Sequence, residues 1–193
     1  MNRVNLILIL LLLGLGGESL AAQNCSIDNP NITPDSRYKK ASDGALVIDK
    51  ETGLMWMACS AGQTYDASAS SCTGVPQKFV WKAALEYAEQ TNQGSKANFT
   101  YTDWRLPSIN ELRSLGRHDC TTPAVNLRFF PNTQPNYYWS SSPTTLSASK
   151  AWGVGDGGGY RAPIEKLKDT FSYLPGDPEL PVLVRLVRTY QGD

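Results

Sequence analysis

The sequence predicts a small α+β domain, with two helices before residue 121 and a loop-rich, mainly antiparallel sheet after it. Three observations predict this class. Apolar residues recur at helical spacing from residue 81, and again from residue 109 behind a capping motif. Beyond residue 121 no helical period is present, and short apolar runs alternate with connections rich in Gly, Pro and Ser. Helices followed by strands are typical of α+β domains and not of alternating α/β sheets.

The first predicted helix starts at Trp81 and runs for about three turns. From there, apolar residues recur at intervals of three and four, and polar side chains cover the opposite side. The apolar positions are Trp81, Ala84, Leu85 and Ala88, and the polar positions are Lys82, Glu86, Glu89 and Gln90.

The second predicted helix is short and has a defined start. Ser108 followed by Glu111 is a capping box, in which each side chain bonds the other residue's amide. Pro107 holds the preceding residue extended, so the chain turns into the helix at this point. We expect Gly116 to end the helix. Its apolar face is formed by Ile109, Leu112 and Leu115.

Several short apolar runs predict strands. The runs at 45–49 and 54–58 are separated by Lys50 to Gly53, and a glycine that takes positive φ there predicts a hairpin. In the last run, residues 181–188, both faces of the strand carry apolar residues. This is typical of a central strand that is covered on both sides. The later runs lie at 137–141, 150–155 and 181–188.

Residues 1–21 have the pattern of a secretory signal peptide. Arg3 is followed by an apolar core of about ten residues, too short to span a bilayer, and then by a small-x-small cleavage site. An uncleaved anchor helix, or a lipid anchor at Cys25, are the alternatives. We expect an exported protein with a polar tail at 22–42, one domain at 43–190 and no membrane span after cleavage.

The charge balance limits the classes of partner. Lysine plus arginine equal aspartate plus glutamate, 18 against 18. A neutral domain has no global field that would gather nucleic acid, so we expect no nucleic-acid partner. The oligomeric state is left open.

All four cysteines lie beyond the predicted cleavage site, and an even count in an exported chain predicts two disulfides. Three pairings are possible. Cys59 and Cys72 bracket a short polar loop, which favours that pair and leaves Cys25 with Cys120. The spacings do not match a zinc site, and we expect neither a metal nor a cofactor.

The residues indicate no catalytic constellation. His118 is the only histidine, and no Gly-x-Ser-x-Gly elbow is present. The serines at 140–142 have no visible base. Gln134–Asn136 matches in type a calcium-binding triplet of some C-type lectins, but its companion Trp-Asn-Asp string is missing. We therefore expect a protein that is not an enzyme.

Candidate ligand-binding residues are few. We expect recognition to fall on the connecting segments between about 121 and 180. The loop 156–161 could approach a ligand closely or be a simple turn, and the basic residues after it could form a cluster or a solvated face. The candidates are Tyr137, Tyr160, Arg161, Lys166 and Lys168.

A run of short motifs resembles the Lcl C-terminal domain family, a domain of unknown function on exported bacterial proteins. The resemblance covers roughly residues 43–188. The cysteine placement is similar to that of a four-cysteine branch of the family. The motifs, in order, are Thr52–Trp56, Trp81–Ala88, Asp103–Pro107 with Glu111 and Leu112, Phe130–Asn132, Tyr138–Ser142, Ala151–Trp152 and Val184–Arg188.

The resemblance implies a C-type lectin-like fold, in which the terminal strands pair and two helices flank the sheet. It also implies that most matching residues are scaffold, with the arginines paired to nearby carboxylates such as Asp103 or Glu111. The alternatives are a tryptophan that stacks on a sugar and an arginine that binds an anionic group of a ligand. These structural residues are Trp56, Trp81, Asp103, Trp104, Arg105, Glu111, Trp139, Trp152, Arg185 and Arg188.

Two main functions follow from the resemblance. The first is a non-enzymatic recognition domain for a glycan or protein ligand, in the periplasm or at the bacterial cell surface. The second is an enzyme related to the formylglycine-generating, sulfatase-modifying oxidases, which requires a reactive cysteine. A structural envelope protein is a third possibility without a distinguishing residue.

Overall fold

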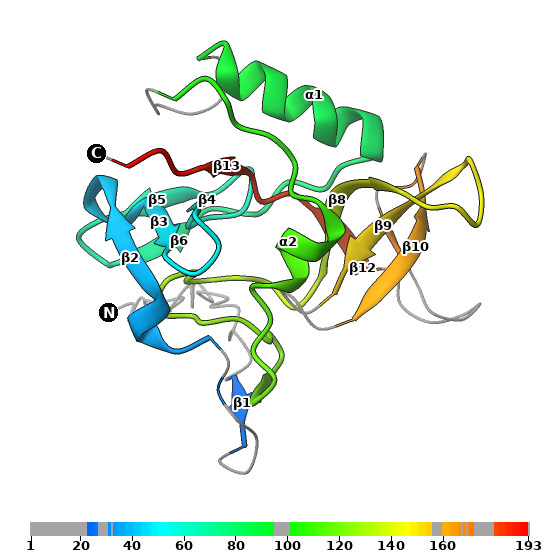
Figure 1. The fold of residues 1–193 in the computed structure, drawn as a ribbon. Helices are drawn as coiled ribbons and strands as arrows, with labels where there is room; N and C mark the ends of the chain where they lie inside the picture. Colours follow the sequence, from blue (N-terminus) through cyan, green and yellow to red (C-terminus); the bar gives the residue numbers. More distant parts are fainter. Residues whose placement is uncertain are drawn as a thin grey trace, which may run out of the picture.

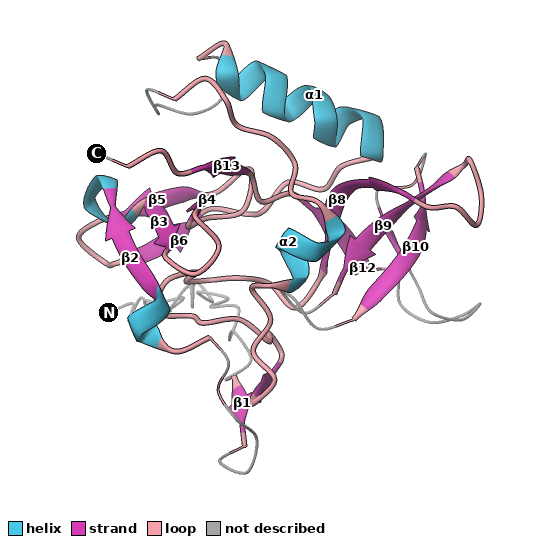
Figure 2. Cartoon of the chain, in the orientation of Figure 1, coloured by secondary structure: helices cyan, strands magenta, loops and turns pink. Residues whose placement is uncertain are grey.

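The computed structural model describes residues 23–26, 31, 33–94, 101–155, 160–166, 168, 170–171 and 180–192. The predicted signal peptide at 1–21 and residues 156–159 of the predicted loop lie outside these residues. Figure 1 shows how the helices and sheets are arranged, and Figure 2 shows how much of the chain between them is loop. A helix long and apolar enough to cross a membrane was not found in the described part of the chain.

One sheet has four strands in the order β13-β4-β3-β2. Its centre is the predicted hairpin, in which β3 (Leu46–Asp49) pairs antiparallel with β4 (Leu54–Met57). Gly53 closes the turn with a φ of 66°, so this prediction is confirmed. β2 (Tyr38–Ala41) forms one edge and β13 (Val187–Thr189) the other.

The second sheet has five strands in the order β10-β9-β8-β12-β11. The pairs are antiparallel except that β12 runs parallel to β8. Its strands are β8 (Tyr137–Pro143), β9 (Lys150–Val154), β10 (Arg161–Glu165), β11 (Thr170–Phe171) and β12 (Leu180–Leu183). β8 and β9 were predicted, whereas β10 was not.

The run predicted as one strand at 181–188 is divided between the two sheets. β12 pairs with β8 in the five-stranded sheet, and β13 pairs with β4 in the four-stranded sheet. The three residues between them, 184–186, are buried but belong to no strand. Both faces of this run are covered, as predicted, because alternate residues enter two different apolar clusters.

The same alternation divides the core. Leu46, Ile48 and Met55 enter one cluster, whereas Val47 and Trp56 enter the other. Side chains of successive strand residues point to opposite faces, so the hairpin is covered on both sides. The first cluster includes residues of the first helix, and the second includes residues of the second helix. The described part of the chain is therefore α+β with two α-helices, although the predicted single sheet is divided into two larger sheets and two small two-stranded sheets.

The first helix, α1 (Trp81–Asn92), has the predicted start and length. Its buried face is rotated relative to the prediction. Ala84 and Ala88 are buried as expected, but Tyr87 and Thr91 complete the face. Leu85 is only partly buried, and Trp81 packs at the rim of the cluster.

The second helix, α2 (Ile109–Arg113), has the predicted capping box. Ser108 Oγ accepts from the Glu111 amide at 3.3 Å, and Glu111 Oε2 accepts from the Ser108 amide at 2.7 Å. The helix ends at Arg113, before Gly116, because Ser114 already takes the C-cap position. The predicted role of Gly116 as terminator is therefore wrong.

The predicted tail at 22–42 carries regular structure. A 3₁₀ turn, η1 (Asp35–Arg37), leads into β2, which pairs with β3 along its whole length. A second 3₁₀ turn, η2 (Ser42–Gly44), connects β2 to β3. Arg37 and Asp49 form an ion pair whose side chains are 6% and 0% exposed, which fastens the tail to the sheet.

Both predicted disulfides are present. Cys59 is bonded to Cys72 and Cys25 to Cys120, so all four cysteines are paired. Each bond holds a small two-stranded sheet in place. The strands are β5 (Thr64–Asp66) with β6 (Ser71–Thr73), and β1 (Asn24–Cys25) with β7 (Cys120–Thr121).

Candidate functional site

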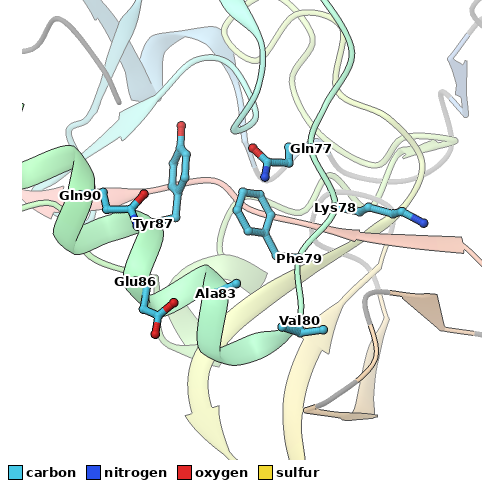
Figure 3. Close-up of a pocket in the computed structure, with 8 residues that line it drawn as sticks. All are labelled: Gln77, Lys78, Phe79, Val80, Ala83, Glu86, Tyr87 and Gln90. Atoms are coloured by element: carbon cyan, nitrogen blue, oxygen red, sulfur yellow. The ribbon is translucent and has the colours of Figure 1, made fainter. Parts of the chain in front are cut away.

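A hollow of about 350 Å³ lies beside α1 and is the candidate site. One wall is the segment before the helix, and the other is the side of the helix that faces this segment (Figure 3). We call it the α1 hollow. Its lining residues are Gln77, Lys78, Phe79, Val80, Ala83, Glu86, Tyr87 and Gln90.

The wall before the helix is fixed by main-chain hydrogen bonds. The Gln77 amide donates to Ala61 O at 2.8 Å, and the Phe79 amide donates to Val182 O at 2.9 Å. The Phe79 carbonyl accepts from the Trp139 indole at 2.7 Å. Because this wall is bonded to the core on both sides, the hollow is pre-formed, as small-ligand sites usually are.

Two aromatic rings form the floor. Phe79 and Tyr87 lie edge to face, with ring centroids 5.2 Å apart, and both residues are buried. Burial raises the pKa of the Tyr87 hydroxyl, against a smaller opposite effect of a hydrogen bond with the Gly62 main chain. Tyr87 therefore stays neutral, and because its hydroxyl is bonded to the Gly62 main chain it contributes a ring edge rather than a charge.

The rim is polar and carries one charge of each sign. Gln77, Lys78, Glu86 and Gln90 are all exposed. In Figure 3 the Lys78 side chain extends away from α1. Glu86 also lies 3.4 Å from Lys82 on the same helix. The amides and the carboxylate offer hydrogen bonds to a polar ligand.

The lining holds no histidine, cysteine or serine that could act as a nucleophile with a base. Across the described residues, no group of three or more His, Cys, Asp or Glu is placed to hold a metal ion. The arrangement is suited to binding. It offers an aromatic floor and hydrogen-bonding groups at the rim.

The residues proposed from the sequence lie elsewhere. Tyr137 is 2% exposed and packs in the core, so it is wrong as a surface contact. Tyr160 is 72% exposed, and Lys168 is also exposed. Lys166 places its ammonium 4.6 Å from the centre of the Trp81 ring and donates to Ala148 O. Arg161 places its guanidinium 5.2 Å from the centre of the Trp152 ring.

The tryptophans are scaffold to different degrees. Trp56, Trp104 and Trp139 are buried, as expected. Trp81 and Trp152 are only half-buried, and each has a basic side chain over its ring. The half-buried rings were not distinguished by the sequence, because all five sit in apolar motifs.

Two arginines have the expected carboxylate partners. Arg105 donates to Glu111 through Nη1 and Nη2, at 2.8 and 2.7 Å. Its hydrogen bond, opposed by burial, lowers the pKa of the Glu111 carboxyl. Arg188 Nε donates to Asp103 Oδ1 at 2.6 Å.

Arg185 departs from this expectation. Its guanidinium is buried and donates to the carbonyls of Met57 and Ala58 and to Thr133 Oγ1. The rings of Phe130 and Tyr138 lie 5.0 and 5.7 Å from it. Burial lowers the pKa of this guanidinium. Within the described chain, the prediction of a carboxylate partner is wrong for Arg185.

The α1 hollow was not predicted from the sequence. Its polar rim was interpreted as the solvent side of an amphipathic helix, and Tyr87 was not assigned to either face. The available indication was Phe79, an aromatic residue just before the helix start. The hollow becomes visible only when the preceding segment is folded back against α1.

Comparison with known families supports the resemblance. The family model described as the Lcl C-terminal domain matches residues 45–188, well over half of the chain. The predicted resemblance covered nearly the same residues and is confirmed. No curated protein matches the sequence.

Proposed function

The chain belongs to the Lcl C-terminal domain family, and from this premise we propose that it is an exported, non-enzymatic recognition domain. Its ligand is a glycan or a protein, bound in the periplasm or at the bacterial cell surface. The observation that carries the proposal is the α1 hollow, which has a pre-formed aromatic floor and hydrogen-bonding groups at its rim. Because a fold alone does not determine function, the proposed recognition role has to be supported by the site.

Export is supported by the cysteines. Two disulfides tie together parts of the chain that lie 95 and 13 residues apart. Disulfides of this structural kind persist in oxidising compartments and are rare in the cytosol. The family and the disulfides therefore support the same compartment.

A C-type lectin-like fold is part of the proposal. In support, the last strand, β13, returns to pair with β4 from the first half of the chain. The two helices contribute to clusters that involve opposite faces of the strands. Folds of this class bind ligands on irregular surface segments. Residues 77–80 at the α1 hollow form one such segment.

The enzyme alternative has less support. An oxidase of the formylglycine-generating class requires a reactive thiol, and all four cysteines of this chain are in disulfides. A thiol-labelling measurement on the native protein checks this point directly. Labelling of one or more cysteines without prior reduction would revive the alternative.

The test of the proposal uses a bulky side chain in the hollow. We expect the purified, oxidised protein to retain a glycan on an array or a protein in a pull-down. Ala83→Trp fills the hollow and should reduce that binding about tenfold or more. Glu89→Trp is the matched control, because it adds the same ring at an exposed position of the same helix outside the lining.

Three results are informative. Binding lost in Ala83→Trp and kept in Glu89→Trp supports the α1 hollow as the site. Equal binding by both variants and the wild-type protein shows that the ligand binds elsewhere. If the wild-type protein binds nothing on the array or in the pull-down, the result argues against a recognition role.

A further inference from the structure

The outer face of the β9–β10 hairpin carries an unusual residue. Along β9, Ala151 and Gly153 face the core and are buried, whereas Trp152 between them faces outward and is half-buried. Its cross-strand partner is Pro163, which is also half-buried. Polar residues usually occupy the solvent face of an antiparallel sheet, so a tryptophan beside a proline on this face is an apolar patch.

The helix α2 covers only one end of this face. Val154 has the same orientation as Trp152, and it is buried in the cluster that includes Leu112 of α2. Trp152 lies two residues before Val154 on the same face of β9, and it is only half-buried. The packing of α2 therefore stops short of the indole ring, and the exposed part of the ring is not needed to close the core.

Arg161 lies over this ring, and within the described residues it has no counter-charge. Its guanidinium is 5.2 Å from the ring centre, and the residue is exposed. Among the described residues, no carboxylate lies within ion-pair distance of it. By contrast, Lys150 and Glu165, at the other end of the hairpin, pair with each other at 3.4 Å. A guanidinium stacked on an aromatic ring keeps its N–H donors free for a planar acceptor such as a carboxylate.

The indole N–H of Trp152 is a second free donor in the described part of the chain. The indoles of Trp81 and Trp139 donate to carbonyls at 2.8 and 2.7 Å, but the indole of Trp152 has no such acceptor. Two independent donors at one apolar patch, a guanidinium and an indole, therefore lack a hydrogen-bond acceptor among the described residues. We call this patch, formed by Trp152, Arg161 and Pro163, the Trp–Arg face.

We propose that the Trp–Arg face binds an acidic peptide segment of a partner protein. A carboxylate of the segment would pair with the guanidinium, and its apolar side chains would pack on Trp152 and Pro163. Arginine, tryptophan and tyrosine are the residues that most often dominate protein interfaces. Tyr160, which adjoins Arg161 in the chain, is 72% exposed and adds to the available contact area.

The charge distribution favours a peptide over an acidic polysaccharide. A linear polyanion is held by many cations along its length, but this domain is neutral overall and the Trp–Arg face has a single unpaired cation. The neighbouring Lys150 is neutralised by Glu165. A ligand with one or two carboxylates and an apolar surface is the better complement.

The geometry also favours contact through the face over strand addition. β10 is an edge strand of its sheet. Pro163 lies in its middle and has no N–H, so it interrupts the row of hydrogen-bonding groups that an added strand would need. Side chains, and not the edge, are therefore the available contact surface. This surface shares no residue with the α1 hollow, so it stands apart from the function proposed above.

The test is a titration followed by two-dimensional NMR of the five indole N–H groups. The probe is a blocked heptapeptide of alternating glutamate and leucine, and its glutamine analogue is the uncharged control. The Trp152 signal is identified by its loss in Trp152→Phe. We expect only this signal to shift with the acidic probe, and we expect added salt to weaken the effect.

Arg161→Gln should weaken binding of the acidic probe about tenfold or more, with the other four indole signals unchanged. Lys39→Gln removes a positive charge from the exposed edge of the other sheet and should leave binding unchanged. Equal binding of the glutamine peptide, equal binding by Arg161→Gln, or no shift of Trp152 would overturn the proposal. A uronic-acid polysaccharide that shifts Trp152 where the peptide does not would overturn the choice of partner.

Discussion

Replacing Asp49 by asparagine removes one charge of the buried ion pair that fastens residues 35–41 to the sheet. In the native protein, Arg37 Nε donates to Asp49 Oδ1 at 2.8 Å and Nη2 donates to Oδ2 at 2.5 Å. The two side chains are 6% and 0% exposed. The asparagine would keep the shape of the side chain but leave a buried guanidinium without its main partner.

Removing one partner of a buried pair costs about 3–5 kcal/mol of the free energy of unfolding. Two other contacts compensate Arg37 in part. Glu51 Oε2 lies 3.7 Å from Arg37 Nε, and the Tyr38 ring lies 5.2 Å from the guanidinium. We therefore expect Asp49→Asn to lose about 3 kcal/mol, the lower end of that range. Glu86→Gln is the control, because its pair with Lys82 is exposed and contributes less than about 1 kcal/mol.

The loss should depend on pH. Burial opposes ionisation of Asp49, but hydrogen bonds from Arg37 and Thr52 outweigh it, so the pKa of this carboxyl lies below its ordinary value of 3.8. A carboxyl with a lowered native pKa stabilises the fold above its unfolded pKa, and this stabilisation is lost as the pH falls through the native pKa. The difference between Asp49→Asn and the wild-type protein is therefore full at pH 7 and shrinks below about pH 4.

Urea unfolding at pH 7 and at pH 3, followed by tryptophan fluorescence, measures both quantities. We expect Asp49→Asn to lower the free energy of unfolding strongly at pH 7 and less at pH 3. A loss at pH 7 no larger than that of Glu86→Gln would refute the importance of the buried pair. If Asp49→Asn lowers the free energy of unfolding equally at both pH values, the stabilisation does not come from the charge of the Asp49 carboxylate.

Two further changes test other parts of the scaffold. Arg185→Met leaves two buried carbonyls and a hydroxyl without their donor, so it should lower the free energy of unfolding by about 3 kcal/mol or more in the same urea assay. A change below about 1 kcal/mol would mean that water or neighbouring groups replace the guanidinium. Ser108→Ala removes half of the capping box with Glu111 and should cost about 1 kcal/mol, seen as a lower midpoint of thermal unfolding. An unchanged midpoint would show that α2 is held by packing alone.

The features that could be predicted from the sequence depend on residues close together in the chain. The capping box joins Ser108 to Glu111, and the hairpin turn depends on Gly53 at positive φ. The disulfide between Cys59 and Cys72 closes a short loop. Each of these is decided by local chemistry, so short windows of sequence contain the information.

The strands that were missed are edge strands. β2 carries two exposed lysines, Lys39 and Lys40, in place of an alternating apolar pattern. β10 contains Pro163, which argues against a strand in the middle of a sheet but is tolerated at an edge. Edge strands are held by one neighbour, and their sequences carry features that prevent further pairing.

The site depends on tertiary placement. Phe79 and Tyr87 meet at the α1 hollow because Phe79 is bonded to Val182 and Trp139, residues about 60 to 100 positions away in the chain. The half-exposure of Trp152 likewise depends on where α2 ends over β9. No local pattern contains either relation. The sequence predicts Trp152 as scaffold together with the buried tryptophans, and it assigns no role to Phe79 or Tyr87.

The run from Leu180 to Thr189 completes both sheets, since β12 and β13 join different ones. Neither sheet can therefore acquire its full set of neighbours until this late-synthesised stretch has left the ribosome. Until then β4 and β8 each lack one neighbouring strand, and contacts this distant along the chain form slowly. A chain whose sheets are completed late stays unfolded for longer. An unfolded polypeptide is the form that can pass through a narrow translocation channel.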